Sequence, residues 1–205
     1  MPWLMESKKY FLKYVWKGEL VDFVELGIGG SWLFESPVIS DGRGHFREWF
    51  RATEVEQVLG RSFRVAQANI SISHRGVLRG IHYSLAEKGQ GKWVTCASGA
   101  IWDVIVDLRP ESPTFKRWIG VELSAVNGKA IFVPENLGHA FVSLEDNSVV
   151  TYLLTSPYSP KDEHGIHPLD SELAIGWPSL EMQLSDKDSS APTLKEMITN
   201  KLLPK

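Results

Sequence analysis

The middle of the chain is a series of short apolar runs separated by polar turn segments. The runs are rich in β-branched and aromatic residues and occupy residues 64–73, 76–83, 92–99, 100–109, 117–123, 129–134, 139–145 and 148–155. The segments between them carry Gly, Pro, Asn, Asp or Ser. Strands that recur every ~8–12 residues are typical of antiparallel sandwiches and barrels. The pattern therefore predicts a mostly-β domain, and the number of strands fits a double-sheet jelly roll.

Helical patterns are few and short. Residues 53–60 predict a helix that Thr53 caps and Gly60 ends, and a second short helix is expected from Pro192 to Met197. Because the strands do not alternate with long helices, a parallel α/β sheet is disfavoured. We expect residues 1–25 to form an N-terminal appendage. Residues 26–205 are expected to form the jelly-roll domain, with 156–205 as its loop-rich C-terminal cover.

Composition indicates an ordinary globular protein. The 205 residues are 43% apolar and 23% charged, with a formal net charge of −3. This charge gives no overall basic field for nucleic acid or a membrane surface, and no apolar run approaches the ~20 residues of a membrane span. Cys96 is the only cysteine, so it can form neither an internal disulfide nor a thiolate metal site alone. The first 20 residues lack the pattern of a signal peptide, and we expect a cytoplasmic protein.

The run GVLRGIHY, residues 76–83, places two ionisable side chains in an apolar strand. Polar groups in a buried strand are unfavourable unless something satisfies them. Strict alternation puts Arg79 on one face of this strand and His82 on the other, together with Gly80. Since a jelly roll can enclose a cavity, an inward-facing His82 is a candidate base. The alternative interpretation is a histidine whose hydrogen bonds are satisfied in the core.

Further polar residues interrupt apolar strands or follow them: Lys92, Asp103, Asp107, His139, Tyr152, Asp186, Lys187 and Asp188. A histidine, a lysine, a tyrosine and a carboxylate that converge on one cavity would suit proton abstraction beside a carbonyl. Histidine takes the proton, a carboxylate fixes its tautomer, and a cation stabilises the enolate oxygen. The structural alternatives are a core aromatic for Tyr152, exposed strand ends for Lys92 and Lys187, and a helix N-cap for Asp188.

Several segments occur in an order that resembles the dTDP-4-dehydrorhamnose 3,5-epimerase family, including related 3- or 5-epimerases of deoxysugar pathways. The segments are DGRGHFREWF (41–50), QANISISHRGVLRGIHY (67–83), GKWVTCASGAIWDVIVDLRPESPTF (91–115), PENLGHAF (134–141), VTYLLTSPYSPKDEHGI (150–166) and LSDKDSSAP (184–192). The resemblance covers about residues 26–204. It implies a homodimeric, metal-free, cupin-like jelly roll (a double-stranded β-helix) with a few short helices.

The resemblance also implies a reaction and the residues that perform it. The reaction is epimerisation of dTDP-4-dehydro-6-deoxy-D-glucose at C3 and C5, beside the C4 ketone, through an enolate and towards dTDP-L-rhamnose. No cofactor is implied. The implied catalytic roles are those of His82 as base, Asp188 as its dyad partner, Tyr152 as the opposing acid and Lys92 as the group that stabilises the enolate.

The substrate contacts carry over in the same way. His139 is implied to contact the sugar and Arg79 the pyrophosphate, which its planar fork matches. Tyr158 matches an aromatic that stacks on thymine. Further implied contacts to substrate come from Arg43, Glu48, Gln67, Asn69, Glu163 and Lys187, and part of the site is supplied across the dimer.

Metal binding is the competing use of His82 and His139. Cupin-type barrels usually offer a His-x-His pair, a glutamate and a distant histidine, but Ser84 stands where the second histidine of the pair would be. A three-ligand site is therefore incomplete, and we predict no metal.

Some positions depart from the family pattern, namely His45, Asn136, Gly138, Ala140 and Pro157. They concern the wall of the pocket and keep open the alternative of a mono-epimerase that acts at C3 or C5 only. Less favoured alternatives are a 3,4-ketoisomerase, a metal-dependent cupin enzyme and a non-catalytic nucleotide-sugar binder. The sequence leaves open which centres invert, which pathway the enzyme serves and what residues 1–25 do.

Overall fold

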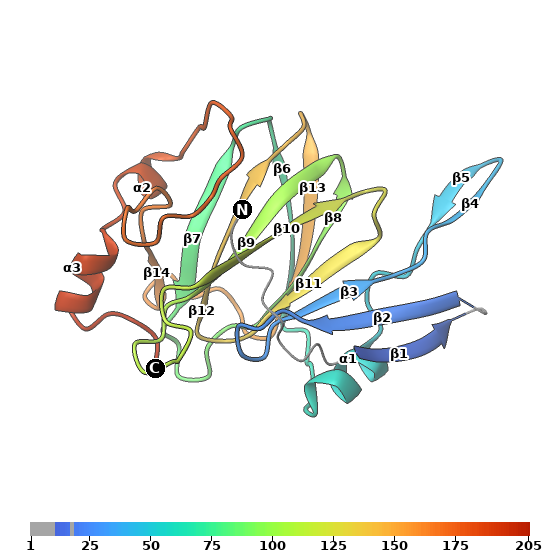
Figure 1. Cartoon of the computed structure of the whole chain (residues 1–205), viewed down its shortest axis with the longest axis horizontal. Helices are drawn as coiled ribbons and strands as arrows, with labels where there is room; N and C mark the ends of the chain where they lie inside the picture. Colours follow the sequence, from blue (N-terminus) through green and yellow to red (C-terminus); the bar gives the residue numbers. More distant parts are fainter. Residues whose placement is uncertain (1–10, 17–18) are drawn as a thin grey trace.

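The computed structural model describes residues 11–16 and 19–205, which form two large antiparallel sheets and a separate two-stranded arm (Figure 1). The seven-stranded sheet has the order β1-β2-β3-β11-β8-β13-β6, and the five-stranded sheet has the order β10-β9-β12-β7-β14. The strands are β1 (Phe11–Trp16), β2 (Glu19–Glu25), β3 (Trp32–Glu35), β4 (Ile39–Asp41), β5 (Gly44–Phe46), β6 (Gln67–Ser73), β7 (Leu78–Ser84), β8 (Lys92–Ser98), β9 (Ala100–Asp107), β10 (Trp118–Ser124), β11 (Lys129–Val133), β12 (Leu137–Ser143), β13 (Ser148–Leu154) and β14 (Glu163–Gly165). The helices are α1 (Ala52–Leu59), α2 (Asp186–Ser189) and α3 (Leu194–Thr199).

From β6 onward the chain crosses between the two sheets at almost every turn. Strands β6, β8, β11 and β13 belong to the seven-stranded sheet, whereas β7, β9, β10, β12 and β14 belong to the five-stranded sheet. This interleaving produces the predicted jelly roll, and each of the predicted apolar runs forms a strand. No helix in the described part of the chain is long and apolar enough to cross a membrane.

Two local predictions differ from the structure. The N-cap of α1 is Arg51 rather than Thr53, which lies within the first turn, while Gly60 ends the helix with φ 65° as predicted. The strands near the N-terminus were not predicted: β2 pairs with β3, and Phe23 of β2 is buried in the core. The division of the chain at residue 25 falls at the end of β2 and stays a prediction.

The core has three layers, because both sheets are covered on their outer faces as well. The central cluster lies between the sheets and contains Val94 and Val150 from one sheet and Ile105 and Phe141 from the other. Helix α1 covers the outer face of the seven-stranded sheet, where Val55 packs in one cluster with Phe23 of β2 and Trp93 of β8. The C-terminal segment, including α3, covers the five-stranded sheet. Inward-facing positions of the strands are thereby held in a rigid frame.

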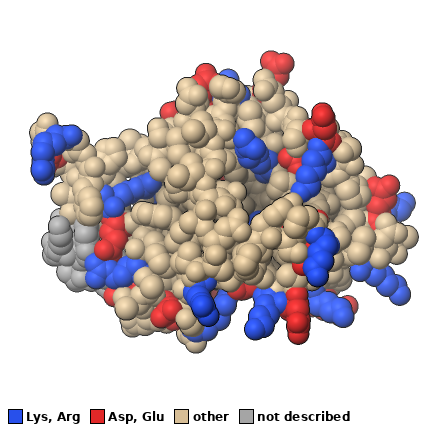
Figure 2. All heavy atoms as spheres, turned by 180° about the vertical axis from the view of Figure 1, so that it is seen from behind, with Lys and Arg blue, Asp and Glu red and all other residues tan. Residues whose placement is uncertain are grey.

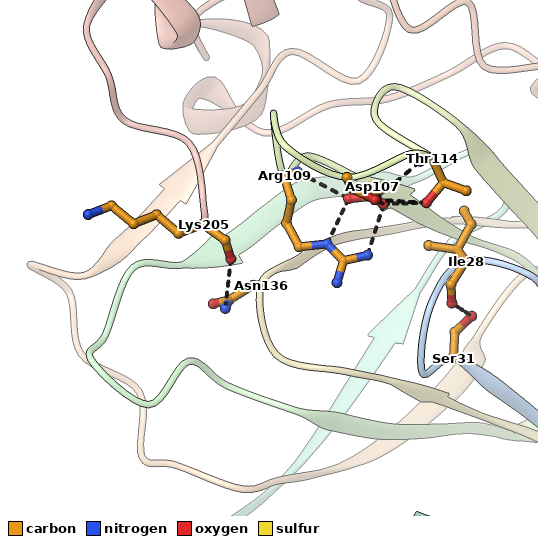
Figure 3. Close-up of polar contacts among 8 residues, drawn as sticks. Ile28, Ser31, Asp107, Arg109, Thr114, Asn136 and Lys205 are labelled. Atoms are coloured by element: carbon orange, nitrogen blue, oxygen red, sulfur yellow. Dashed lines mark hydrogen bonds and ion pairs between the residues drawn. The ribbon is translucent and has the colours of Figure 1, made fainter.

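Polar contacts surround the buried carboxylate of Asp107 at the end of β9 (Figure 3). The carboxylate of Asp107 accepts hydrogen bonds from Arg109, Ser112 and Thr114, at 2.9, 2.6 and 2.5 Å for the three side chains. Burial raises the pKa of Asp107, but these hydrogen bonds outweigh it and lower the pKa to about 2. Nearby, Asn136 donates to the backbone carbonyl of Lys205 and so ties down the C-terminus.

Strand β7 contains a bulge at Gly80 that changes the direction of its side chains. Its partner β12 pairs His139 with His82 but Phe141 with Arg79, so Gly80 and Ile81 together stand opposite Ala140. The extra residue resets the alternation, and Arg79 and His82 consequently line the same cavity. The prediction that they lie on opposite faces is therefore wrong, because strict alternation holds only for an unbulged strand.

Glycine is required at this bulge. Gly80 has φ 117°, and a Cβ atom there would lie 2.6 Å from both the Cβ of Ala140 and the backbone oxygen of His139. Gly42 in the arm is a matched control, because a Cβ added there meets nothing within 4 Å.

We predict that Gly80→Ala lowers the free energy of unfolding by about 3 kcal/mol, because it combines overpacking with a strained backbone. Gly42→Ala should change it by less than about 0.5 kcal/mol. Urea denaturation of both variants provides the measurement. Equal changes in the two variants would show that β7 does not need the close approach at Gly80.

Candidate active site

A cavity of about 310 Å³ lies between the two sheets and brings together eleven of the thirteen predicted site residues. Gln67, Asn69, Lys92 and Tyr152 come from the seven-stranded sheet, Arg79, His82, His139 and Glu163 from the five-stranded sheet, and Tyr158, Lys187 and Asp188 from the C-terminal cover. Seen from behind, the molecule is hollowed near the middle of this face, and Lys and Arg side chains gather around the hollow (Figure 2).

His82 and Asp188 form a hydrogen-bonded pair in this cavity. Nε2 of His82 lies 2.6 Å from Oδ1 of Asp188, which α2 presents to β7. The N-cap of α2 is Ser185, whose hydroxyl accepts a hydrogen bond from the Asp188 backbone. The interpretation of Asp188 as an N-cap is thus wrong. Its side chain instead orients an imidazole whose other nitrogen, Nδ1, does not contact the carboxylate.

The environment keeps Asp188 ionised. Burial raises the pKa of Asp188, but the hydrogen bond and charge of His82, with hydrogen bonds from Ser185 and from the Gly80 backbone, hold the pKa below its usual value. An ionised carboxylate of this kind fixes the tautomer of a histidine and stabilises its protonated form. The bulge at Gly80 therefore contributes to the His82–Asp188 pair as well as to the placement of Arg79.

His139 and Asp103 form a second pair beside the first. The Asp103 carboxylate lies 2.9 and 3.0 Å from Nε2 of His139, and both residues are buried. His139 stands directly opposite His82 on the neighbouring strand. Each histidine is thus hydrogen-bonded to its own aspartate. Among the residues that the structure describes, no group of three or more His, Cys, Asp or Glu side chains could hold a metal ion.

Lys92 is the buried cation of the cavity. It opens β8 but is only 8% exposed, so the interpretation as an exposed strand end is wrong. Burial lowers the pKa of Lys92, while the charges of Glu163 and Asp103 raise it and that of Lys187 lowers it. Lys187 itself is exposed on α2. A desolvated ammonium interacts strongly with any negative charge that forms beside it.

Tyr152 faces His82 from the opposite sheet. It lies on β13, beside Asn69 on the edge strand β6, and its side chain both lines the cavity and packs against the central core cluster. Ser71, two residues beyond Asn69, also lines the cavity, and its buried hydroxyl has no hydrogen-bond partner among the described residues. Ser71 was not among the predicted site residues, although it shares the inward alternation of Gln67 and Asn69.

The outer part of the cavity combines an aromatic ring with cations. Tyr158 is 52% exposed, and its backbone N–H donates to Oε1 of Gln67 at 2.8 Å. The guanidinium of Arg79 donates to the Ser73 hydroxyl and the Ile72 carbonyl at 3.1 and 3.3 Å, which leaves part of its fork accessible. Gln90, which the sequence analysis did not identify, also lines this part of the cavity.

Two predicted site residues lie outside the cavity of their own chain. Arg43 is on the β4–β5 arm, which projects from the body of the molecule (Figure 1), and it pairs with Asp41. Glu48 forms an ion pair with Arg51 at 2.7 Å. The roles assigned to all thirteen residues stay predictions.

The arrangement supplies the parts that acid–base chemistry beside a carbonyl needs. One sheet provides an imidazole paired with a carboxylate, and the other provides a phenol and a buried ammonium. A ligand between the sheets would contact a base on one side, a proton donor on the other and a cation near its centre. The exposed aromatic and the guanidinium at the mouth suit a nucleotide portion.

Known proteins resemble this chain over most of its length. A family model described as dTDP-4-dehydrorhamnose 3,5-epimerase matches residues 25–196. A dTDP-4-dehydrorhamnose 3,5-epimerase of Streptomyces griseus is 44% identical over 87% of this chain and 90% of its own. Two solved structures match as well. NovW, a 4-keto-6-deoxy sugar epimerase of Streptomyces spheroides, is 42% identical with a TM-score of 0.88 and covers 93% of this chain and 96% of its own. ChmJ, a 3′-monoepimerase of Streptomyces bikiniensis solved with dTDP-quinovose, is 46% identical with a TM-score of 0.85 and covers 87% and 91%.

These matches include the strands and loops that build the cavity, and they agree with the chemistry of its residues. The chain belongs to the dTDP-4-dehydrorhamnose 3,5-epimerase family and is an epimerase of the isomerase class.

Proposed function

We propose that this enzyme epimerises dTDP-4-dehydro-6-deoxy-D-glucose at C3 and C5, beside the C4 ketone, and so provides dTDP-4-dehydro-L-rhamnose for conversion to dTDP-L-rhamnose. The observation that carries the proposal is the convergence of the His82–Asp188 pair, Lys92 and Tyr152 on one cavity. Support for the substrate class comes from the relatives, because one is named for dTDP-4-dehydrorhamnose and NovW is named for a 4-keto-6-deoxy sugar.

His82 is the base in this mechanism. Its imidazole removes the proton from the carbon next to the ketone, and the electron pair of the broken C–H bond forms the enolate. The ionised Asp188 stabilises the imidazolium that results. Lys92 stabilises the negative charge on the enolate oxygen, and His139, held by Asp103, contacts the sugar beside it.

Tyr152 returns the proton. Because β13 and β7 belong to opposite sheets, a sugar ring between them has Tyr152 on one face and His82 on the other. Proton removal on one face and return on the other inverts the carbon. Exchange with solvent then restores both groups, so each cycle needs no cofactor.

The nucleotide portion occupies the mouth of the cavity. Thymine stacks on Tyr158, and the pyrophosphate lies between Arg79 and Lys187. Gln67, Asn69 and Glu163 provide polar contacts around it. These assignments follow the family resemblance, and they are supported by the fact that all six side chains line the cavity.

A second candidate is mono-epimerisation. ChmJ, a 3′-monoepimerase, is 46% identical to this chain, and the 3,5-epimerase of Streptomyces griseus is 44% identical. The same base, acid and cation serve both reactions, so the number of inverted centres has to be measured.

We predict that the protein incorporates deuterium at both C3 and C5 of dTDP-4-dehydro-6-deoxy-D-glucose in deuterated water. His82→Asn should slow this exchange at least about a hundredfold while dTDP still binds, because the general base is lost. NMR follows the exchange, and His74→Asn, which changes an exposed histidine, is the control. Deuterium at a single carbon would identify a mono-epimerase. Binding of dTDP without any exchange would indicate a different keto sugar or a binding protein.

We predict that Lys92→Met stabilises the protein and inactivates it. Removing a buried charge should raise the free energy of unfolding by about 1 kcal/mol at neutral pH, whereas kcat should fall at least about a hundredfold. The pKa of Lys92 is lowered on folding from 10.5, so the wild type gains stability as pH rises through its folded pKa towards 10.5. The difference in free energy of unfolding between Lys92→Met and the wild type should therefore decrease as the pH rises through that range.

Denaturation at several pH values and NMR assays measure the two effects. Lys195→Met, at an exposed position on α3, should change neither kcat nor the pH dependence of stability. A Lys92→Met enzyme that keeps its activity within tenfold would remove Lys92 from the mechanism.

We also propose a homodimer in which substrate contacts cross the interface. Ile70 and Ile72 are 70% and 61% exposed on the outer face of β6, which is an edge strand of its sheet. Edge strands with exposed apolar side chains favour association. The β4–β5 arm exposes Phe46 next to Arg43 and projects from the body (Figure 1). In the proposed dimer, Arg43 and Glu48 of one protomer approach the cavity of its partner.

We predict that the protein has twice the mass of one chain in solution and that Ile70→Asp, alone or with Ile72→Asp, gives a folded monomer. Light scattering coupled to size-exclusion chromatography measures the mass, and circular dichroism checks folding. Val126→Asp is the matched control, because Val126 is 78% exposed in the turn between β10 and β11. A monomeric wild type at micromolar concentration would contradict the proposed dimer.

A further inference from the structure

The aromatic ring of Tyr158, which we call the nucleobase platform of the proposed site, lies on a loop. Tyr158 lies between β13 and β14, and about half of its side chain is exposed at the mouth of the cavity. A ring on an exposed loop loses conformational freedom when a base stacks on it, and that loss weakens binding unless the loop is already ordered. The affinity for nucleotide thus depends on what holds the segment 155–158.

A second segment, residues 89–91, lies alongside this loop and is hydrogen-bonded to it. The Thr155 N–H donates to the Gly91 carbonyl at 3.0 Å, and the Gly91 N–H donates to the Thr155 hydroxyl at 2.8 Å. The Ser156 hydroxyl donates to the Gly89 carbonyl at 3.0 Å. Residues 89–91 lead directly into Lys92, so the loop and the start of β8 form one hydrogen-bonded unit.

Gln90 makes the contact closest to Tyr158 from this side. Its carboxamide Nε2 donates to the Ser156 carbonyl at 3.2 Å and lies 3.5 Å from the Pro157 carbonyl. Gln90 is only 9% exposed, and a buried amide that loses its partner is unfavourable. The hydrogen bond from Gln90 to the Ser156 carbonyl therefore restrains the conformation of the loop.

The position of Gln90 is itself fixed by packing. A Cβ atom at Gly89 would lie 2.6 Å from Cβ of Glu135, and one at Gly91 would lie 2.8 Å from Oε1 of Glu135. Glycine on both sides lets the backbone that carries Gln90 approach Glu135 closely.

The loop is restrained on its other side as well. Gln67 accepts the hydrogen bond from the Tyr158 backbone at 2.8 Å, and the Ala66 N–H donates to the Leu154 carbonyl at 2.8 Å. Pro157 limits its own φ and disfavours the helical conformation for Ser156. Tyr158 is consequently held between one glutamine on β6 and another before β8.

We propose that Gln90 is a positioning residue that sets nucleotide affinity by holding loop 155–158, and with it the Tyr158 ring, in the conformation that stacks on the base. The proposal rests on the proposed nucleotide site. It assigns a role to a residue outside the predicted set, acting through Tyr158 rather than through the sugar.

A double-mutant cycle tests this role. Calorimetry measures the Kd of dTDP for the wild type, Gln90→Ala, Tyr158→Ala and the double variant. Gln90→Ala should weaken binding about fivefold, the effect of one net hydrogen bond. If Gln90 acts through Tyr158, the double variant should bind within about twofold of Tyr158→Ala, because neighbouring effects are then not additive.

Steady-state kinetics distinguish an effect on the position of Tyr158 from a general disruption of the active site. Gln90→Ala should raise KM by a similar factor and leave kcat within about twofold, since the base, acid and cation are untouched. Gln90→Glu keeps the side-chain volume but places an oxygen against the Ser156 carbonyl, so it should weaken dTDP binding at least as much as Gln90→Ala. It replaces Gln90→Ala in the test if the alanine variant fails to fold. Gln57→Ala, an exposed glutamine on α1, is the control and should match the wild type.

The outcomes distinguish this inference from the proposed function. Wild-type protein that does not bind dTDP would overturn the proposed function. Wild-type binding with unchanged affinity in Gln90→Ala and Gln90→Glu would overturn only the role of Gln90. If the losses of dTDP-binding free energy in the two single variants add up in the double variant, the proposed role of Gln90 is also overturned, because Gln90 would then act independently of Tyr158.

Discussion

The close approach of β7 to β12 at Gly80 is the constraint on which the rest of the site depends. Two residues of β7 stand opposite one residue of β12 there, and only glycine fits against Ala140. The bulge brings Arg79 to the cavity that His82 already faces. It also frees the Gly80 N–H from the strand ladder, and this group hydrogen-bonds to Asp188. One irregular residue thus connects the cation at the mouth, the proposed base and the carboxylate that is hydrogen-bonded to it.

The cavity is arranged so that each of its buried ionisable groups has a hydrogen-bond partner or an opposite charge nearby. Asp188 is paired with His82 and Asp103 with His139, while Glu163 and Asp103 offset the burial of Lys92. Unpaired buried charges would be strongly unfavourable, and this balance is what permits an ammonium inside a β sandwich. The same balance leaves Lys92 incompletely compensated, which suits a group whose full partner is an enolate formed only during the reaction.

The sequence predicted the central strands because their apolar residues recur at short intervals between turn residues, and tertiary pairing follows that pattern. It also predicted the convergence of His82, Lys92, Tyr152 and Asp188, which lie far apart in the chain, because the family resemblance placed them together. It failed where a local irregularity decides the geometry. Alternation cannot reveal the bulge at Gly80, so Arg79 was assigned to the wrong face. Ser71 and Gln90 were missed because a serine in a strand and a glutamine in a loop become informative only once their buried surroundings are known.

Strand β6 would link ligand binding to assembly in the proposed dimer. Its inward row, Gln67, Asn69 and Ser71, is polar and faces the cavity, whereas its outward row contains the exposed Ile70 and Ile72. An edge strand has a neighbour on one side only, so its position is less restrained than that of a central strand. In the proposed dimer, a second copy covers the outward row and restrains the strand that carries the inward one. Because Gln67 also holds the backbone of Tyr158, dimerisation would order the nucleobase platform without touching it.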